Sequence, residues 1–273
     1  MDVDPATLRD LAVAIAREAG DLLTERLHLE RSHVDTKSTG TDMVTEMDTA
    51  SERLIVDRIL AARPDDGIVG EEGASVDGRS GIRWVVDPLD GTTNYLYRLP
   101  GWNVSIGVEA DGEAIAAAVS IPSIGDHFAA AVGLGATCNG DPIRISTPAP
   151  LDEALVGTGF NYDAGVRVEQ VRNLGRLIGR VRDIRRSGAA AADLCAVAAG
   201  RLDAYYESGL GHWDWSAGAL VAAEAGARVE VITDHPLPGP LVVAAHPDRW
   251  ESFVALLRDG RILPGEDLEP TPR

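Results

Sequence analysis

The sequence predicts an α/β protein made of layered sheets and helices. Along most of its 273 residues, segments with the apolar periodicity of helices alternate with short β-like runs. Between residues 103 and 146 the pattern changes to successive short strands joined by tight turns, which indicates a meander. A meander inside an alternating chain favours stacked layers over a simple doubly wound sheet. The sequence lacks a Gly-rich dinucleotide loop and a phosphate-loop lysine motif.

The helices are expected where apolar residues recur at helical spacing. Residues 7–27 place Leu8 and Leu11 partly on one face, and residues 44–62 form a second apolar stripe that Pro64 ends. The remaining helices are expected at residues 167–179, 189–199, 215–225 and 250–257.

The strands are expected in the β-rich runs between these helices. Asp111-Gly112 and Asn139-Gly140 are turn signals within the meander. The expected strands are residues 67–70, 84–87, 103–109, 114–121, 128–132, 143–146, 155–160, 181–185, 202–207, 228–232 and 241–245.

The length of the chain allows one large domain or two intimate ones. We expect a single domain over residues 1–260, with an N-terminal half to about residue 150 and a C-terminal half over residues 151–260. Residues 261–273 are rich in proline and acids, which predicts a loose tail.

Composition excludes several classes of protein. A hydrophobic content of 45% with 25% charged residues is typical of globular proteins. No apolar run approaches the roughly 20 residues that span a bilayer, and the N-terminus lacks the features of a signal peptide. Two cysteines are too few for a disulfide framework, so we expect reduced thiols, a cytoplasmic protein and no membrane partner. The net charge of −18 argues against binding nucleic acid, and against a phosphate ester unless bound cations offset it.

The most informative stretch is residues 84–94, WVVDPLDGTTN. Pro88 cannot donate to a sheet ladder, so we expect the strand to end near Asp87. Gly91 permits a tight turn, and Thr92 is well placed to begin a helix whose free backbone N–H groups can face an anion. Carboxylates at the strand end bind hard cations. The stretch therefore predicts both halves of a metal and phosphate site.

Four acids are candidates for one cleft. Asp87 and Asp90 flank a proline at a strand end and repel each other unless cations or hydrogen-bond donors compensate. Glu71 follows a short strand and Asp214 lies between two tryptophans at the expected N-cap of a helix. Glu71 alone also fits a solvated loop acid, and Asp214 alone fits an ordinary helix cap.

Further polar positions could complete the site. Asp48 and Thr92 could form a carboxylate–hydroxyl pair that orients water, or they could be a first-turn helix acid and a cap. Gly188 and Ala189 lie in a second possible anion-facing helix start, which also fits a plain β–α connection. Glu207 ends an expected strand and could accept hydrogen bonds from a polyol or lie on the surface.

These motifs resemble those of the inositol monophosphatase family of magnesium-dependent, lithium-sensitive phosphatases. The similarity extends over about residues 8–257 in the correct order. The matching pieces are Gly70-Glu71-Glu72, residues 87–94, residues 213–219, Glu224-Ala225-Gly226, and Lys37 with residues 42–48. The resemblance implies an alternating α/β/α/β/α sandwich of the inositol monophosphatase and fructose-1,6-bisphosphatase type, and a homodimer.

The resemblance also implies roles for individual residues. Two or three Mg²⁺ ions would be held by Glu71, Asp87, the Leu89 carbonyl, Asp90 and Asp214. The substrate would be bound by Asp90, Gly91, Thr92, Gly188, Ala189, Glu207 and Asp214. Catalysis would use Glu71 and Thr92 with Asp48 to orient the attacking water. Ala190 and Ala191 depart from the family pattern, which often has Ser or Thr and another small residue there, and residues 163–180 cannot be aligned.

The leading functional hypothesis is Mg²⁺-dependent hydrolysis of a small phosphorylated polyol, with myo-inositol 1-phosphate as substrate. Alternatives within the family are histidinol phosphate, fructose 1,6-bisphosphate and 3′-phosphoadenosine 5′-phosphate. Thr93 stands where the histidinol-phosphate enzymes often carry lysine, and Glu207 favours a polyol. A different class is a non-catalytic regulator on the same fold that binds transcription or translation machinery.

Overall fold

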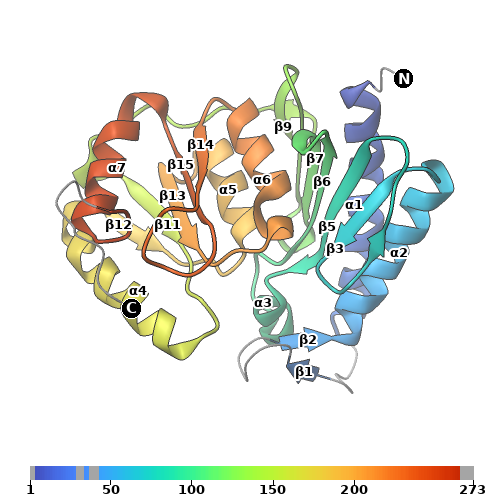
Figure 1. The fold of residues 1–273 in the computed structure, drawn as a ribbon, viewed down its shortest axis with the longest axis horizontal. Helices are drawn as coiled ribbons and strands as arrows, with labels where there is room; N and C mark the ends of the chain where they lie inside the picture. Colours follow the sequence, from blue (N-terminus) through green and yellow to red (C-terminus); the bar gives the residue numbers. More distant parts are fainter. Residues whose placement is uncertain (1–3, 29–33, 37–42, 265–273) are drawn as a thin grey trace.

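An eight-stranded sheet and a five-stranded sheet stack with helices outside and between them (Figure 1). The computed structural model describes residues 4–28, 34–36 and 43–264. Its helices are α1 (Pro5–Arg26), α2 (Glu46–Ala62), α3 (Thr92–Tyr97), α4 (Ala164–Leu177), α5 (Ala190–Ala198), α6 (His212–Glu224) and α7 (Trp250–Asp259). Its strands are β1 (Val34–Thr36), β2 (Met43–Thr45), β3 (Gly67–Gly70), β4 (Ser75–Val76), β5 (Ile82–Asp90), β6 (Asn103–Ala110), β7 (Glu113–Ile121), β8 (Asp126–Ala131), β9 (Gly135–Cys138), β10 (Asp141–Pro142), β11 (Leu155–Thr158), β12 (Asp183–Arg185), β13 (Ala204–Ser208), β14 (Arg228–Ile232) and β15 (Leu241–Ala245).

The larger sheet has the strand order β10-β9-β8-β7-β6-β5-β3-β4. Strands β5 to β10 form an antiparallel meander, and β3 runs parallel to β5. Helices α1 and α2 cover its outer face, where Leu8, Ile15 and Ile55 pack against Trp84 in one buried cluster. The predicted meander is confirmed.

The smaller sheet has the order β12-β11-β13-β15-β14, with β11 parallel to both of its neighbours. Helices α4 and α7 lie on its outer side (Figure 1). Trp250, Phe253 and Leu257 of α7 pack with Tyr206 and Val243 in a separate buried cluster.

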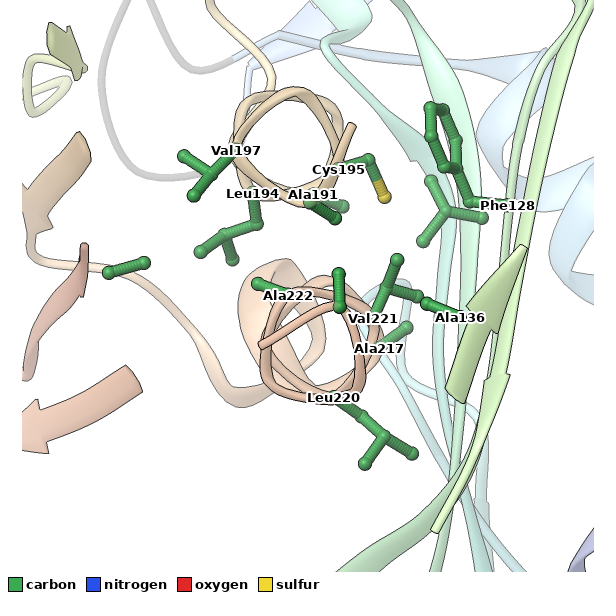
Figure 2. Packing of buried hydrophobic residues seen from close by; sticks show 14 of the residues in the cluster. Phe128, Ala136, Ala191, Leu194, Cys195, Val197, Ala217, Leu220, Val221 and Ala222 are labelled. Atoms are coloured by element: carbon green, nitrogen blue, oxygen red, sulfur yellow. The ribbon is translucent and has the colours of Figure 1, made fainter. Parts of the chain in front are cut away.

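Helices α5 and α6 form the middle layer between the sheets, and small side chains let them approach closely. A Cβ added to Gly218 of α6 would lie 3.1 Å from the Cα of Ala191 in α5. Figure 2 shows Cys195, Val221 and their neighbours filling the space toward Phe128 of the larger sheet. Burying this apolar surface is the main stabilising contribution. The layer order α/β/α/β/α is thus confirmed.

The turns of the meander follow the sequence signals. Asp111 and Gly112 have φ of 52° and 85°, and Asn139 and Gly140 have 55° and 88°. A type I′ hairpin turn requires two successive residues with positive φ, and Asp-Gly and Asn-Gly adopt this conformation at low energetic cost.

Two strand predictions were wrong. Strand β5 does not end near Asp87 but continues through Pro88 to Asp90, because its register with β6 shifts between the two acids. At such an irregularity no ladder hydrogen bond is required from residue 88, so the sheet tolerates a proline there. Residues 143–146 are not a strand, whereas β9 (Gly135–Cys138), which was not predicted, closes a hairpin on β8.

Helix α6 begins three residues before the predicted start. Its N-cap is Gly211, so Asp214 lies inside the first turn and is not the N-cap as predicted. Helix α2 begins at Glu46, two residues after the predicted start, because β2 precedes it.

Several predictions concern parts of the chain that the structure does not describe or test. Lys37, Asp42 and most of the predicted tail lie outside the described residues. The division into halves near residue 150 stays a prediction. Among the described residues, no helix combines the length and hydropathy needed to cross a bilayer.

Candidate active site

The acids of the predicted site come together at one end of the larger sheet. Glu71 directly follows β3, and its backbone N–H donates to the Val86 carbonyl of the parallel strand β5 at 3.1 Å. Asp87 and Asp90 lie on β5 itself, and Asp214 reaches the same place from the first turn of α6. Carboxylate oxygens of Glu71, Asp87 and Asp214 all lie within 4.8 Å of one another.

These acids line a cleft of about 340 Å³ between the two sheets. The residues predicted to bind metal, phosphate or substrate all line it, namely Glu71, Asp87, Leu89, Asp90, Gly91, Thr92, Gly188, Ala189, Glu207 and Asp214. Asp48 does not line the cleft but lies behind Thr92. A volume of this order suits a small ligand.

The three aspartates of the cleft, Asp87, Asp90 and Asp214, have raised pKa values. Burial first, and then repulsion from Glu71, Asp90 and Asp214, raises the pKa of Asp87 well above its usual value. Burial also raises the pKa of Asp214, with Asp90 and Glu71 adding to the effect. Burial raises the pKa of Asp90 to about 7, although hydrogen bonds from Asn103 and Ala191 oppose the shift.

The donor set fits a hard divalent cation. The converging groups are all carboxylates, and repulsion from Glu71, Asp90 and Asp214 adds to burial in raising the pKa of Asp87. A divalent cation would relieve this repulsion, because it offsets the charge of the carboxylates. Oxygen ligands without nitrogen or sulfur favour Mg²⁺, Ca²⁺ or Mn²⁺ over Zn²⁺.

The start of α3 pairs a hydroxyl with a buried acid. Thr92 Oγ1 lies 3.0 Å from Asp48 Oδ1 and 3.1 Å from the Leu89 carbonyl oxygen. Asp48 is fully buried in the first turn of α2. The predicted carboxylate–hydroxyl pair is therefore present, and it reaches the cleft through Thr92.

The starts of α3 and α5 meet at the cleft. Gly91 has φ of 80°, and a Cβ added to it would lie 3.1 Å from that of Ala189. Asp90 Oδ2 accepts hydrogen bonds from the Ala191 backbone N–H at 3.0 Å and from Asn103 Nδ2 at 2.9 Å. Asp90 thus satisfies one orphan N–H of the α5 start, as a capping side chain does. This contact ties the larger sheet to the second half of the chain.

Glu207 extends from β13 into the opposite side of the cleft. Its Oε2 accepts a hydrogen bond from the Tyr205 hydroxyl at 2.7 Å, and burial raises its pKa to about 7. Gly159 leaves the space for this carboxylate, since a Cβ there would collide with both oxygens. Glu207 therefore has an oxygen available to a ligand hydroxyl in the cleft.

Sequence reasoning gave no individual role to two charged groups near the cleft. Arg186 is the only Lys, Arg or His among the lining residues that the structure describes. Asp193, in the first turn of α5, is buried, which raises its pKa to about 6 despite hydrogen bonds from Ser187. Arg186 lies two residues before Gly188, but a single Arg in an Arg-rich chain carries no signal.

The chain is similar to characterised proteins over nearly its whole length. The model of the inositol monophosphatase family matches residues 4–259. Inositol-1-monophosphatase SuhB of Mycobacterium tuberculosis (H37Rv) is 42% identical over 290 aligned residues, which cover 99% of this chain and 98% of that protein. Nus factor SuhB of Escherichia coli (K12) is 38% identical over 255, covering 92% and 95%.

Solved structures give the same picture. The structure of Mycobacterium tuberculosis SuhB matches with a TM-score of 0.85 at 41% identity, covering 96% of this chain and 100% of that one. The matched family acts on phosphate esters and generally depends on metal ions, which agrees with the acidic cluster in the cleft. This chain belongs to the inositol monophosphatase family.

Proposed function

We propose that the protein hydrolyses small phosphate monoesters with Mg²⁺, and that myo-inositol 1-phosphate is its preferred substrate. The observation that carries the proposal is the convergence of Glu71, Asp87 and Asp214 within one cleft. The name of the Mycobacterium tuberculosis relative, at 42% identity, supports inositol phosphate as the substrate.

The acidic side of the cleft is proposed to hold the metal and the reacting phosphate. Two or three Mg²⁺ ions, held by Glu71, Asp87, the Leu89 carbonyl, Asp90 and Asp214, would supply positive charge to the phosphate dianion and make a water molecule more acidic. The backbone N–H groups of Gly91 and Thr92 donate to phosphate oxygens.

The remaining residues position the reactants. Glu71 and the Thr92–Asp48 pair orient the attacking water, since the Thr92 hydroxyl is held by Asp48 at 3.0 Å. Asp90 and Asp214 border the ester, and Glu207 accepts hydrogen bonds from its hydroxyl groups. Gly188 and Ala189 complete the wall beside the sugar alcohol.

Other esters compete with this assignment. Histidinol phosphate stays an alternative substrate. Fructose 1,6-bisphosphate and 3′-phosphoadenosine 5′-phosphate also stay alternatives, because Arg186 in the cleft offers a positive charge to their second phosphate. Phosphate release from these four esters, measured with Mg²⁺, ranks them. We expect the highest kcat/KM with inositol 1-phosphate, complete loss of turnover in EDTA and recovery when Mg²⁺ is added back. Turnover that persists in EDTA contradicts the proposal.

A second candidate function rests on the name of the Escherichia coli relative, a Nus factor at 38% identity. A regulatory protein on this fold would bind transcription machinery without needing turnover. A protein inactive toward every ester, with intact folding, supports this candidate.

We also propose a cytoplasmic homodimer with lithium-sensitive activity. Analytical ultracentrifugation tests the dimer, and turnover measured in LiCl tests the lithium sensitivity.

A further inference from the structure

A short polar contact outside the cleft joins the start of α6 to the larger sheet. His212 is the first residue of α6, two residues before Asp214, and its Nε2 lies 2.5 Å from Glu109 Oε1 on β6. The imidazole also stacks on Trp215, with ring centroids 4.7 Å apart and planes inclined by 4°. The imidazole of His212 is therefore held by Trp215 against one ring face and by Glu109 at Nε2.

The carboxylate that meets His212 is itself fixed in the sheet. Glu109 is only 2% exposed, and its second oxygen accepts from Arg83 of β5, with Nη2 at 2.6 Å and Nε at 3.0 Å. Burial alone raises the pKa of Glu109, but hydrogen bonds from His212 and Arg83 outweigh it and leave the pKa below its usual value. Glu109 is thus a buried, ionised acceptor between two strands and a helix.

Other contacts bring the same turn of α6 onto β6. Ser105 Oγ donates to the Trp213 carbonyl at 3.4 Å, and Ser216 Oγ lies 3.5 Å from Glu109 Oε1. A Cβ on Gly107 would lie 2.5 Å from Ser216 Oγ, so the helix rests directly on the strand. These contacts lie on both sides of Asp214 along the helix.

The position of this turn determines where the Asp214 carboxylate lies. Its own hydrogen bond, from the Gly211 N–H at 2.7 Å, fixes the side chain only within the turn. Of the other acids of the proposed metal cluster, Asp87 lies on β5 and Glu71 directly follows β3. The separation between Asp214 and these acids therefore depends on how the turn is attached to β5 and β6. Among the described hydrogen bonds at this attachment, the His212–Glu109 contact is the shortest.

We propose that His212 and Glu109 are positioning residues that hold Asp214 at metal-binding distance from Glu71 and Asp87. The inference rests on the proposed metal site. Partners that orient metal ligands from outside commonly affect metal affinity by about 10- to 100-fold.

Calorimetric titration of the full chain with Mn²⁺ tests the pair without relying on turnover. His212→Phe keeps a ring to stack on Trp215 but removes the donor to Glu109, and we expect Mn²⁺ to bind about 10-fold more weakly. His212→Gln restores a donor near the Nε2 position and should recover most of the affinity. Arg83→Gln is the matched control, because it removes a donor from the other Glu109 oxygen and leaves the helix contact in place. Its Mn²⁺ affinity should stay within about twofold of wild type.

The outcomes separate the positioning role from the metal site itself. If the wild-type protein binds no Mn²⁺, the proposed function fails first. If it binds Mn²⁺ and His212→Phe binds equally well, or Arg83→Gln weakens binding as much, the positioning role is wrong. Steady-state kinetics should show a raised Mg²⁺ activation constant for His212→Phe, with kcat at saturating Mg²⁺ within about twofold of wild type. Should His212→Phe fail to fold, Glu109→Met, which keeps the length of the side chain but removes the acceptor, must show weaker Mn²⁺ binding.

Discussion

The Glu207 carboxylate occupies the space that a side chain on Gly159 would fill. A Cβ at residue 159 would collide with both carboxylate oxygens, so only glycine at this position, directly after β11, admits Glu207 in its present place. Because Glu207 belongs to the smaller sheet and lines the cleft opposite the acids of the larger sheet, we expect it to accept hydrogen bonds from substrate hydroxyls.

Gly159→Ala should therefore weaken substrate binding. The methyl group displaces Glu207, and the loss of one charge-assisted hydrogen bond of about 1.5 kcal/mol raises KM for inositol 1-phosphate about tenfold. Gly175→Ala is a matched control, since a Cβ there meets nothing within 4 Å in helix α4. That change should leave KM alone and stabilise the helix by about 0.5–1 kcal/mol. An unchanged KM in Gly159→Ala would show that Glu207 does not contact the substrate.

The Thr92–Asp48 pair should affect turnover rather than binding. Thr92→Ala removes the hydroxyl that orients water, so kcat should fall about 10²-fold, whereas Thr92→Ser keeps the hydroxyl and should retain most activity. Asp48→Asn should lower kcat as well, and the double variant should be little worse than Thr92→Ala because the two residues act as one unit. Additive losses in single-turnover measurements would contradict a shared role.

Asp90→Asn should lower kcat about 10²-fold or more, as the loss of a key electrostatic group does. An amide oxygen can still accept from the Ala191 N–H that Asp90 now caps, so the variant should fold. Circular dichroism and thermal melting in EDTA check the fold independently of phosphate release. Near-normal turnover in this variant would count heavily against the site.

The metal-free protein should lose stability as the pH rises from about 5 to 8. The pKa values of Asp90 and Glu207, about 7 each, lie above their usual 3.8 and 4.5. Between these limits the folded protein binds more protons than the unfolded chain, so the free energy of unfolding falls as the pH increases. Mg²⁺ competes with those protons at Asp90 and should raise Tm more at about pH 8 than at about pH 5. A metal-free Tm that rises across this range would contradict the assignment.

The parts of the fold that local chemistry specifies were predictable. The meander and its Asp-Gly and Asn-Gly turns follow from alternation and from turn residues whose conformational preferences act without distant partners. The order and class of elements followed as well. The continuation of β5 past Pro88 was not predictable, because it depends on how β6 pairs with it. The short strand β9 contains Gly135 and Ala136, which have little β preference, and it forms by pairing with β8.

The residues of the candidate site were likewise predictable only in part. Asp87, Asp90, Gly91 and Thr92 stand in one stretch, so the sequence alone indicated their chemistry. Gly159, Arg186 and His212 lie at or beside the site only because folding brings distant segments together, and no local pattern distinguishes them from ordinary residues. Predicting them requires the packing of the middle layer.

The thin middle layer has a consequence for the reaction itself. Asp90 and Glu207 belong to different sheets, and the distance between them depends on α5 and α6, whose small residues include Ala191 and Gly218. Enlarging either residue would push α5 away from α6 and shift the start of α5, which lines the cleft at Ala189, without changing a proposed metal ligand. The largest molecule that can bridge the two walls is therefore set by helices buried behind the cleft, and substrate range could shift through substitutions that no inspection of the catalytic residues would reveal.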